Sequence, residues 1–189
     1  MRSWAPARMA DRLDLTIADA RAILEYDRVV FDRFVRRVRA LPGREATRPR
    51  GIGHESLFAT LVHILNVHEV WHVHIVHGRT SDPELEALFA DPVRKPRTWK
   101  EFDRYAKRVW AGVDRTMRTL TRRDLARKVH VFWMPGDYTV RDAVYQTTFE
   151  EAHHLGEIIG ALWQDDHEPP EMTWLGVRLA LARRKRARR

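Results

Sequence analysis

The sequence predicts an all-α protein, an up-down-up-down four-helix bundle. Four long segments repeat apolar residues every three or four positions, which is the period of an amphipathic α-helix. The chain has 189 residues, the size of one ordinary domain, and its 44% hydrophobic and 32% charged residues are typical of globular proteins. Because no apolar run reaches the roughly 18 residues of a membrane span, the four helices are expected to pack against one another.

The first two helices are expected over residues 17–41 and 54–77. The first has a stripe of apolar residues on one face and ends at the sequence Leu-Pro-Gly. The second is apolar over much of its circumference, which predicts a position deep in the core. Gly78 follows its last periodic residue and suits the position just past a helix C-terminus.

The last two helices carry start signals. Thr98 and Glu101 have the spacing of a capping box, and Thr139 and Asp142 have the same spacing. The third helix is expected to run to about residue 120 and the fourth to about Trp163. The following sequence Glu-Pro-Pro-Glu prevents much further extension.

The connecting segments complete the predicted organisation. Residues 81–92 are expected to form one short helix. Residues 127–139 place valines and aromatic residues on both sides of a Pro-Gly pair, which predicts a short hairpin or an extended loop before the last bundle helix. We expect residues 1–175 to form a single domain and residues 176–189 to form a basic C-terminal tail.

The charge of the chain is concentrated at its C-terminus. The net charge is +8, and the last nine residues contain six basic residues and no acidic one. Such a tail could bind a phosphate backbone or an anionic membrane surface, or it could be a solvated terminus. The N-terminus lacks the apolar region of a signal peptide, so a cytoplasmic location is expected.

The sequence contains no cysteine, so disulfides, thiolate ligands and cysteine nucleophiles are excluded. A metal site would have to use histidine, carboxylate, carbonyl or water ligands. On a helical wheel Glu150, His154 and Glu157 form a polar row beside the apolar stripe of the last helix, whereas His153 points toward solvent. A carboxylate and an imidazole four residues apart can bind one metal ion, although such pairs also occur on helix surfaces without metal.

A third ligand would have to come from another helix, and the second helix is rich in histidine. Its histidines are His54, His63, His68, His72, His74 and His77. His63 and His74 are 11 residues apart, about 16 Å along a helix axis, and cannot bind the same ion.

Two motifs resemble those of the DinB-like family, the DinB/YfiT metalloenzymes. They are "LVHILNVHEVW" in the second helix and "HHLGEIIGALWQ" in the last, and the resemblance covers about residues 15–170. It implies a divalent metal ion held by a histidine early in the second helix and by a His-x-x-x-His pair on the last. His63 and His154 match two of these ligands, but Glu150 stands where the family usually has histidine.

The resemblance therefore predicts a metal site formed by His63, Glu150 and His154. The substitution at position 150 either creates a site of two histidines and one carboxylate or abolishes binding. Glutamate is an acceptable ligand for zinc, nickel, iron or manganese. The identity of the divalent metal ion is left open among these four.

The function implied by the resemblance is a metal-dependent transferase or hydrolase acting on a small molecule, with thiol transfer as one reaction. Similar proteins are often homodimers. Glu157 and His68 are candidates for acid–base roles, although the wheel puts His68 on a different face from His63. Two alternatives remain: a non-catalytic stress-response protein that contacts nucleic acid through the basic tail, and a structural bundle in which the cluster is vestigial.

Overall fold

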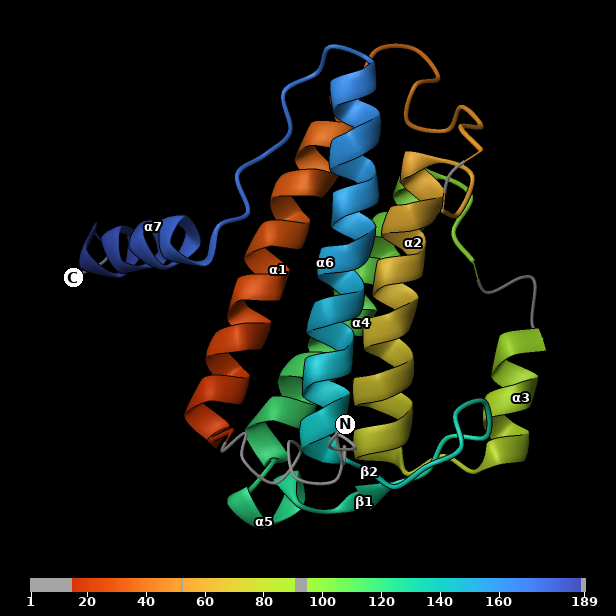
Figure 1. The fold of residues 1–189 in the computed structure, drawn as a ribbon, viewed down its shortest axis with the longest axis vertical. Coiled ribbons are helices and arrows are strands. Elements are labelled where there is room, and N and C mark those ends of the chain that lie inside the picture. Colours follow the sequence, from red (N-terminus) through yellow and green to blue (C-terminus); the bar gives the residue numbers. More distant parts are fainter. Residues whose placement is uncertain (1–14, 52, 91–94, 188–189) are drawn as a thin grey trace, which may run out of the picture.

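The all-α class is confirmed by the computed structural model, which describes residues 15–51, 53–90 and 95–187, with side chains as far as Arg183. Four helical segments lie side by side (Figure 1). They are α1 (Ile17–Arg39), α2 (Leu57–His68) with its continuation η3 (Glu69–Gly78), α4 (Trp99–Thr119) and α6 (Val140–Gln164). α1 and the α2–η3 segment each pack against the other three, so the space between the four is the core of the protein.

The core is filled by aliphatic and aromatic side chains from all four segments. Phe31 of α1 stacks on Phe102 of α4 at a ring separation of 6.2 Å and meets the edge of Trp110 at 5.8 Å. Leu61 from α2 and Ile158 from α6 are completely buried. Burial of such side chains stabilises the fold by about 1.5–3 kcal/mol each.

The start of each long helix follows its capping residue. Thr98 and Thr139 both accept a hydrogen bond from the backbone three residues later, as their capping boxes predict. The predicted start of the second helix at His54 is wrong, because Ser56 is the N-cap and Leu57 the first helical residue. His54 therefore lies in the turn before α2.

The second helix changes its winding after His68. Residues Glu69–Gly78 form a π-helix, and the segment ends at Arg79, whose φ of 53° is left-handed, one residue beyond the predicted Gly78. A π-helix has more residues per turn than an α-helix. A wheel drawn for an α-helix therefore misplaces the side chains of η3.

The connections lie at the periphery of these helices. α3 (Asp82–Ala90) follows η3, and α5 (Arg122–Leu125) follows α4. The predicted hairpin is confirmed: β1 (Lys128–Val129) pairs antiparallel with β2 (Tyr138–Thr139), with Lys128 opposite Thr139.

The C-terminal segment returns along α1. Arg37 donates to the carbonyl of Glu168 at 2.9 Å, and Arg33 donates to that of Glu171 at 2.7 Å. Helix α7 (Trp174–Ala187) begins against α1, where Val177 is completely buried, and its C-terminal end extends away from the other helices (Figure 1). Residues 176–187 of the predicted tail form most of α7, and the division at residue 175 stays a prediction. Within the described residues, no helix combines the length and the apolarity needed to cross a membrane.

Candidate metal centre

Three histidines from separate parts of the chain meet at the edge of the core. His54 comes from the turn before α2, His63 from α2 and His154 from α6. The His54 and His63 rings stack with their centres 3.7 Å apart, and the His154 ring lies 4.5 Å from that of His63. One ring nitrogen from each lies within 4.8 Å of the other two, close enough for all three to approach one metal ion.

Glu150 adds a carboxylate to this group. Its Oε1 lies 3.4 Å from His154 Nε2 and 3.8 Å from His63 Nε2. Its Oε2 accepts a hydrogen bond from the side-chain amide of Gln146 at 3.0 Å, which holds the carboxylate in this direction. The structure thus brings together His63, Glu150 and His154, and their role as metal ligands stays a prediction.

The helical wheel correctly separates the two adjacent histidines of α6. The side chain of His153 is 67% exposed, whereas that of His154 is 9% exposed. Since consecutive helical residues are about 100° apart, only one of the two can face the histidines near α2.

Glu157 orients His154. Its Oε2 lies 2.8 Å from His154 Nδ1, so the proton on Nδ1 is donated to this carboxylate and the lone pair of Nε2 remains available. A histidine that binds metal through one nitrogen usually donates the other N–H in this way.

A glycine allows the turn before α2 to lie against the same carboxylate. Gly53 has a φ of +46°, and a Cβ built there would collide with Glu157 Oε2. The close approach of this turn to α6 places the neighbouring His54 over His63.

The charge states of the histidines suit a metal ion. Burial, together with repulsion from His54 and His154, lowers the pKa of His63 to about 3. Burial also lowers the pKa of His54. His63 Nε2 is buried and has no hydrogen-bond partner among the described residues. Neutral imidazoles with free lone pairs are the form that binds divalent metals, so these residues fit such an ion.

His54 is the site residue that sequence reasoning did not identify. The predicted second helix includes His54, which in a helix would lie nine residues and more than two turns from His63. The signals for a different assignment were Ser56, a good N-cap, and Gly51 and Gly53, which favour a turn.

The family can be assigned by comparison with known proteins. The DinB superfamily model matches residues 26–158, which include all four residues of the site. The chain belongs to the DinB superfamily. No match to a curated protein was found.

A cavity of about 370 Å³ opens beside the group of His63, Glu150 and His154 in this DinB-superfamily chain. It shares His63 and Glu150 with that group, so a molecule bound in it would lie next to the histidines. Its other lining residues are Asn66, Val67, Val70, Trp71, Phe89, Trp133, Met134 and Gln146. The walls are mainly apolar and aromatic, with two side-chain amides.

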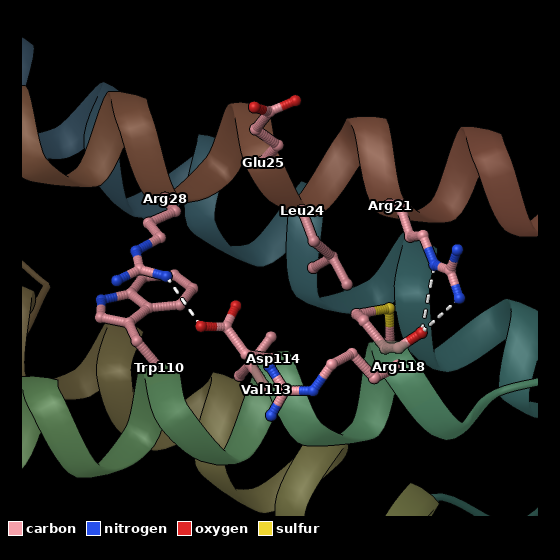
Figure 2. A pocket seen from close by; sticks show the side chains of 9 residues that line it. Arg21, Leu24, Glu25, Arg28, Trp110, Val113, Asp114 and Arg118 are labelled. Carbon is pink, nitrogen blue, oxygen red and sulfur yellow. Dashed lines mark hydrogen bonds and ion pairs between the residues drawn. The ribbon is translucent and has the colours of Figure 1, made fainter.

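A second hollow, between α1 and α4, is of a different kind (Figure 2). Arg28 forms an ion pair with Asp114 at 3.1 Å, and Arg21 donates to the carbonyl of Met117 at 3.1 and 3.2 Å. None of its lining residues is a histidine. The histidine group of the DinB-superfamily chain described above therefore lies outside this hollow, on the α2–α6 side.

Proposed function

We propose that the protein binds a divalent metal ion on an up-down-up-down four-helix bundle of the DinB/YfiT type and uses it to transform a small molecule, by thiol transfer or hydrolysis. The observation that carries this proposal is His63 Nε2. It is a buried nitrogen without a hydrogen-bond partner that faces two further imidazoles and a carboxylate. Leaving such an atom unsatisfied costs about 1–3 kcal/mol, and a metal ion would remove this cost.

The proposed ligands are His54, His63, Glu150 and His154. Nitrogen and carboxylate ligands of this kind suit zinc, nickel, iron or manganese. His54 would supply the third imidazole from the turn before α2, in a chain that carries Glu150 at the family's usual histidine position. When bound, such a metal lowers the pKa of a coordinated water or thiol and so supplies a nucleophile at neutral pH.

The surrounding residues would position the ligands and the substrate. Gln146 holds Glu150 by its hydrogen bond, and Glu157 holds His154 in the tautomer with a free Nε2. In the adjoining cavity Trp71 and Trp133 form aromatic walls, which favour a substrate with an apolar part. The amide groups of Asn66 and Gln146 are available to orient its polar end.

The first experiment is metal analysis of the full chain purified without chelators. We expect about one divalent ion at this site, lost in His154→Ala and retained in His153→Ala. The two substitutions remove the same side chain from adjacent positions, so the second controls for general effects on α6. A chain that neither retains metal nor binds added zinc, nickel, iron or manganese would contradict the proposal.

The second experiment tests the reaction. Hydrolysis and thiol transfer are measured with a panel of small substrates, and any activity should disappear in the His154→Ala variant and persist in His153→Ala. A metal-loaded chain with no turnover on any substrate would favour a binding role.

The homodimer implied by the family resemblance belongs to the same proposal. Light scattering coupled to size-exclusion chromatography would measure the mass in solution against the 22.3 kDa of one chain. A mass of one chain at micromolar concentration would contradict a stable dimer.

A further inference from the structure

A second group of histidine and carboxylate side chains lies inside the core. Asp27 of α1, His68 of α2 and Glu151 of α6 are 1%, 0% and 3% exposed. One ligand atom from each lies within 4.8 Å of the other two. Three helices thus direct a metal-binding type of side chain to one buried point.

The polar contacts of this group leave its charge uncompensated. His68 Nε2 lies 2.7 Å from Glu151 Oε2, and the hydroxyl of Thr148 donates to Asp27 Oδ2 at 2.8 Å. Among the described residues neither carboxyl group forms an ion pair with lysine or arginine. Two carboxyl groups buried without such a partner are costly unless another group compensates them.

Two atoms of the group have no hydrogen-bond partner in the described structure. Glu151 Oε1 and His68 Nδ1 are both buried and unsatisfied. Buried polar atoms in folded proteins are nearly always paired, so an unpaired one calls for a further partner such as a water molecule or an ion. Glu151 Oε1 is therefore an available ligand atom on a residue that is almost completely buried.

The short distance between His68 and Glu151 is also compatible with a shared ion. Two donor atoms bound to one metal at about 2.0–2.2 Å lie roughly 3 Å apart. The observed 2.7 Å between His68 Nε2 and Glu151 Oε2 needs only a small adjustment to admit an ion between them and Asp27.

We propose that Asp27, His68 and Glu151 form a second divalent-metal site in the core of the protein. One imidazole nitrogen and two carboxylate oxygens are harder ligands than the imidazoles of the first site, so manganese, iron or zinc fits best. Two carboxylates would balance the charge of the ion, and a position with so little solvent contact suits a structural role.

The two sites are separate. His68 is five residues from His63 in α2, which is about 7.5 Å along the axis and a different face of the helix. Glu151 follows Glu150 in α6 and points about 100° away from it. No residue is shared, so this inference does not depend on the proposed function.

The test uses the full chain and counts bound metal at both sites. Because the core site is closed to solvent, the metal-free protein is unfolded in guanidinium, refolded with excess Zn²⁺ or Mn²⁺ and desalted before metal analysis. With whichever of Zn²⁺ and Mn²⁺ binds more tightly, we expect two ions per chain in the wild type. Asp27→Asn and Glu151→Gln should each hold one ion fewer. These substitutions keep the size of the side chain and weaken its ligand atoms.

His154→Ala serves as the matched variant for the first site. It should retain the core ion, and the double variant Asp27→Asn, His154→Ala should retain none. In the His154→Ala background, metal should raise the thermal midpoint and shift the ¹⁵N resonance of His68 Nε2. Circular dichroism confirms folding of each variant, and Glu151→Gln replaces Asp27→Asn if the latter does not fold.

The possible outcomes separate the two hypotheses. If Asp27→Asn and Glu151→Gln hold as much metal as the wild type after refolding, the core site is refuted and protons neutralise these carboxyls. If His154→Ala changes nothing while Asp27→Asn loses an ion, the core site stands and the ligand assignment of the proposed function fails.

Discussion

The helix pair α2 and α6 carries two histidine–carboxylate groups that differ in their access to solvent. The group of His63, Glu150 and His154 borders a cavity and is partly exposed. The group of His68 and Glu151 is closed off by α1 and by the ring of Trp110, whose centre lies 4.8 Å from that of His68. Similar side chains are therefore accessible to small molecules at one place and enclosed in the core at the other.

The difference follows from what compensates each carboxylate. Glu150 is partly exposed to solvent and accepts a hydrogen bond from the amide of Gln146. Glu151 has neither, and its charge must be neutralised by a proton or an ion inside the protein. Variants at the two groups should consequently affect different properties.

The largest effect is expected for His63→Ala. The change removes a proposed ligand, and even groups that only support ligands change metal affinity by about 10–100-fold. We expect the affinity of the first site to fall by more than about 100-fold, measured by competition with a coloured chelator. His77→Ala, at an exposed position near the end of η3, is the control and should bind like the wild type. Equal affinities in the two variants would remove His63 from the site.

Glu157→Gln should have the next largest effect. It keeps the shape of the side chain but weakens the hydrogen bond that orients His154. A loss of about 10-fold to 100-fold in affinity is expected at the first site, without loss of the core ion. Metal titration of the variant checks this, and a larger loss than in His63→Ala would indicate that Glu157 itself is a ligand.

The buried histidines of η3 and α2 should make stability depend on pH. Burial lowers the pKa of His72 to about 3 from 6.5. Between these pH values the unfolded chain binds a proton at His72 that the folded chain does not. The stability that neutral His72 contributes is therefore present above pH 6.5 and is lost as pH falls toward 3. In His72→Gln the unfolding free energy should fall less steeply as pH decreases, by up to about 1.4 kcal/mol per pH unit.

Chemical denaturation of the metal-free wild type and of His72→Gln from pH 7.5 to 4 measures this difference. Glutamine can retain a hydrogen bond to Thr147, which lies 3.0 Å from His72 Nε2. Asp27 and Glu151 have raised pKa values, so they change stability with pH in the opposite direction. Both proteins contain these two residues, and their effect on stability therefore cancels in the comparison. Parallel curves for the two proteins would show that His72 is not held neutral.

A smaller effect is expected at the turn that supplies His54. Gly53→Ala should lower stability by about 1 kcal/mol because of its left-handed φ, and it should also weaken metal binding by pushing Glu157 away. Gly43 has a similar φ of +57° with nothing within 4 Å of a built Cβ, so Gly43→Ala is a matched control for backbone strain alone. Thermal melts and metal titrations of both variants separate the two contributions, and equal metal affinities would contradict the contact with Glu157.

The smallest change is expected for Glu150→His, which restores the imidazole usual in the family. Affinity for zinc or nickel should be unchanged or higher, as measured by titration. A loss of affinity would mean that Glu150 does not belong to the site.

The sequence by itself determined the helical class, the capped starts of α4 and α6 and the orientation of His154 relative to His153. These features are local: they depend on side chains within one helical turn, such as Thr98 with Glu101 or Glu150 with His154. Periodicity alone therefore predicts them. The family motifs added His63, because they contain information on packing that periodicity lacks.

Only the tertiary structure decided the place of His54, the wider winding of η3 and the meeting of Asp27 with His68 and Glu151. His68 and Glu151 are 83 residues apart, and their contact depends on the rotation and relative height of two packed helices. Neither quantity is encoded in the period of one helix, because packing of the whole core determines them. The position of His54 likewise depends on a turn whose close approach to Glu157 is set by the packing of α2 against α6.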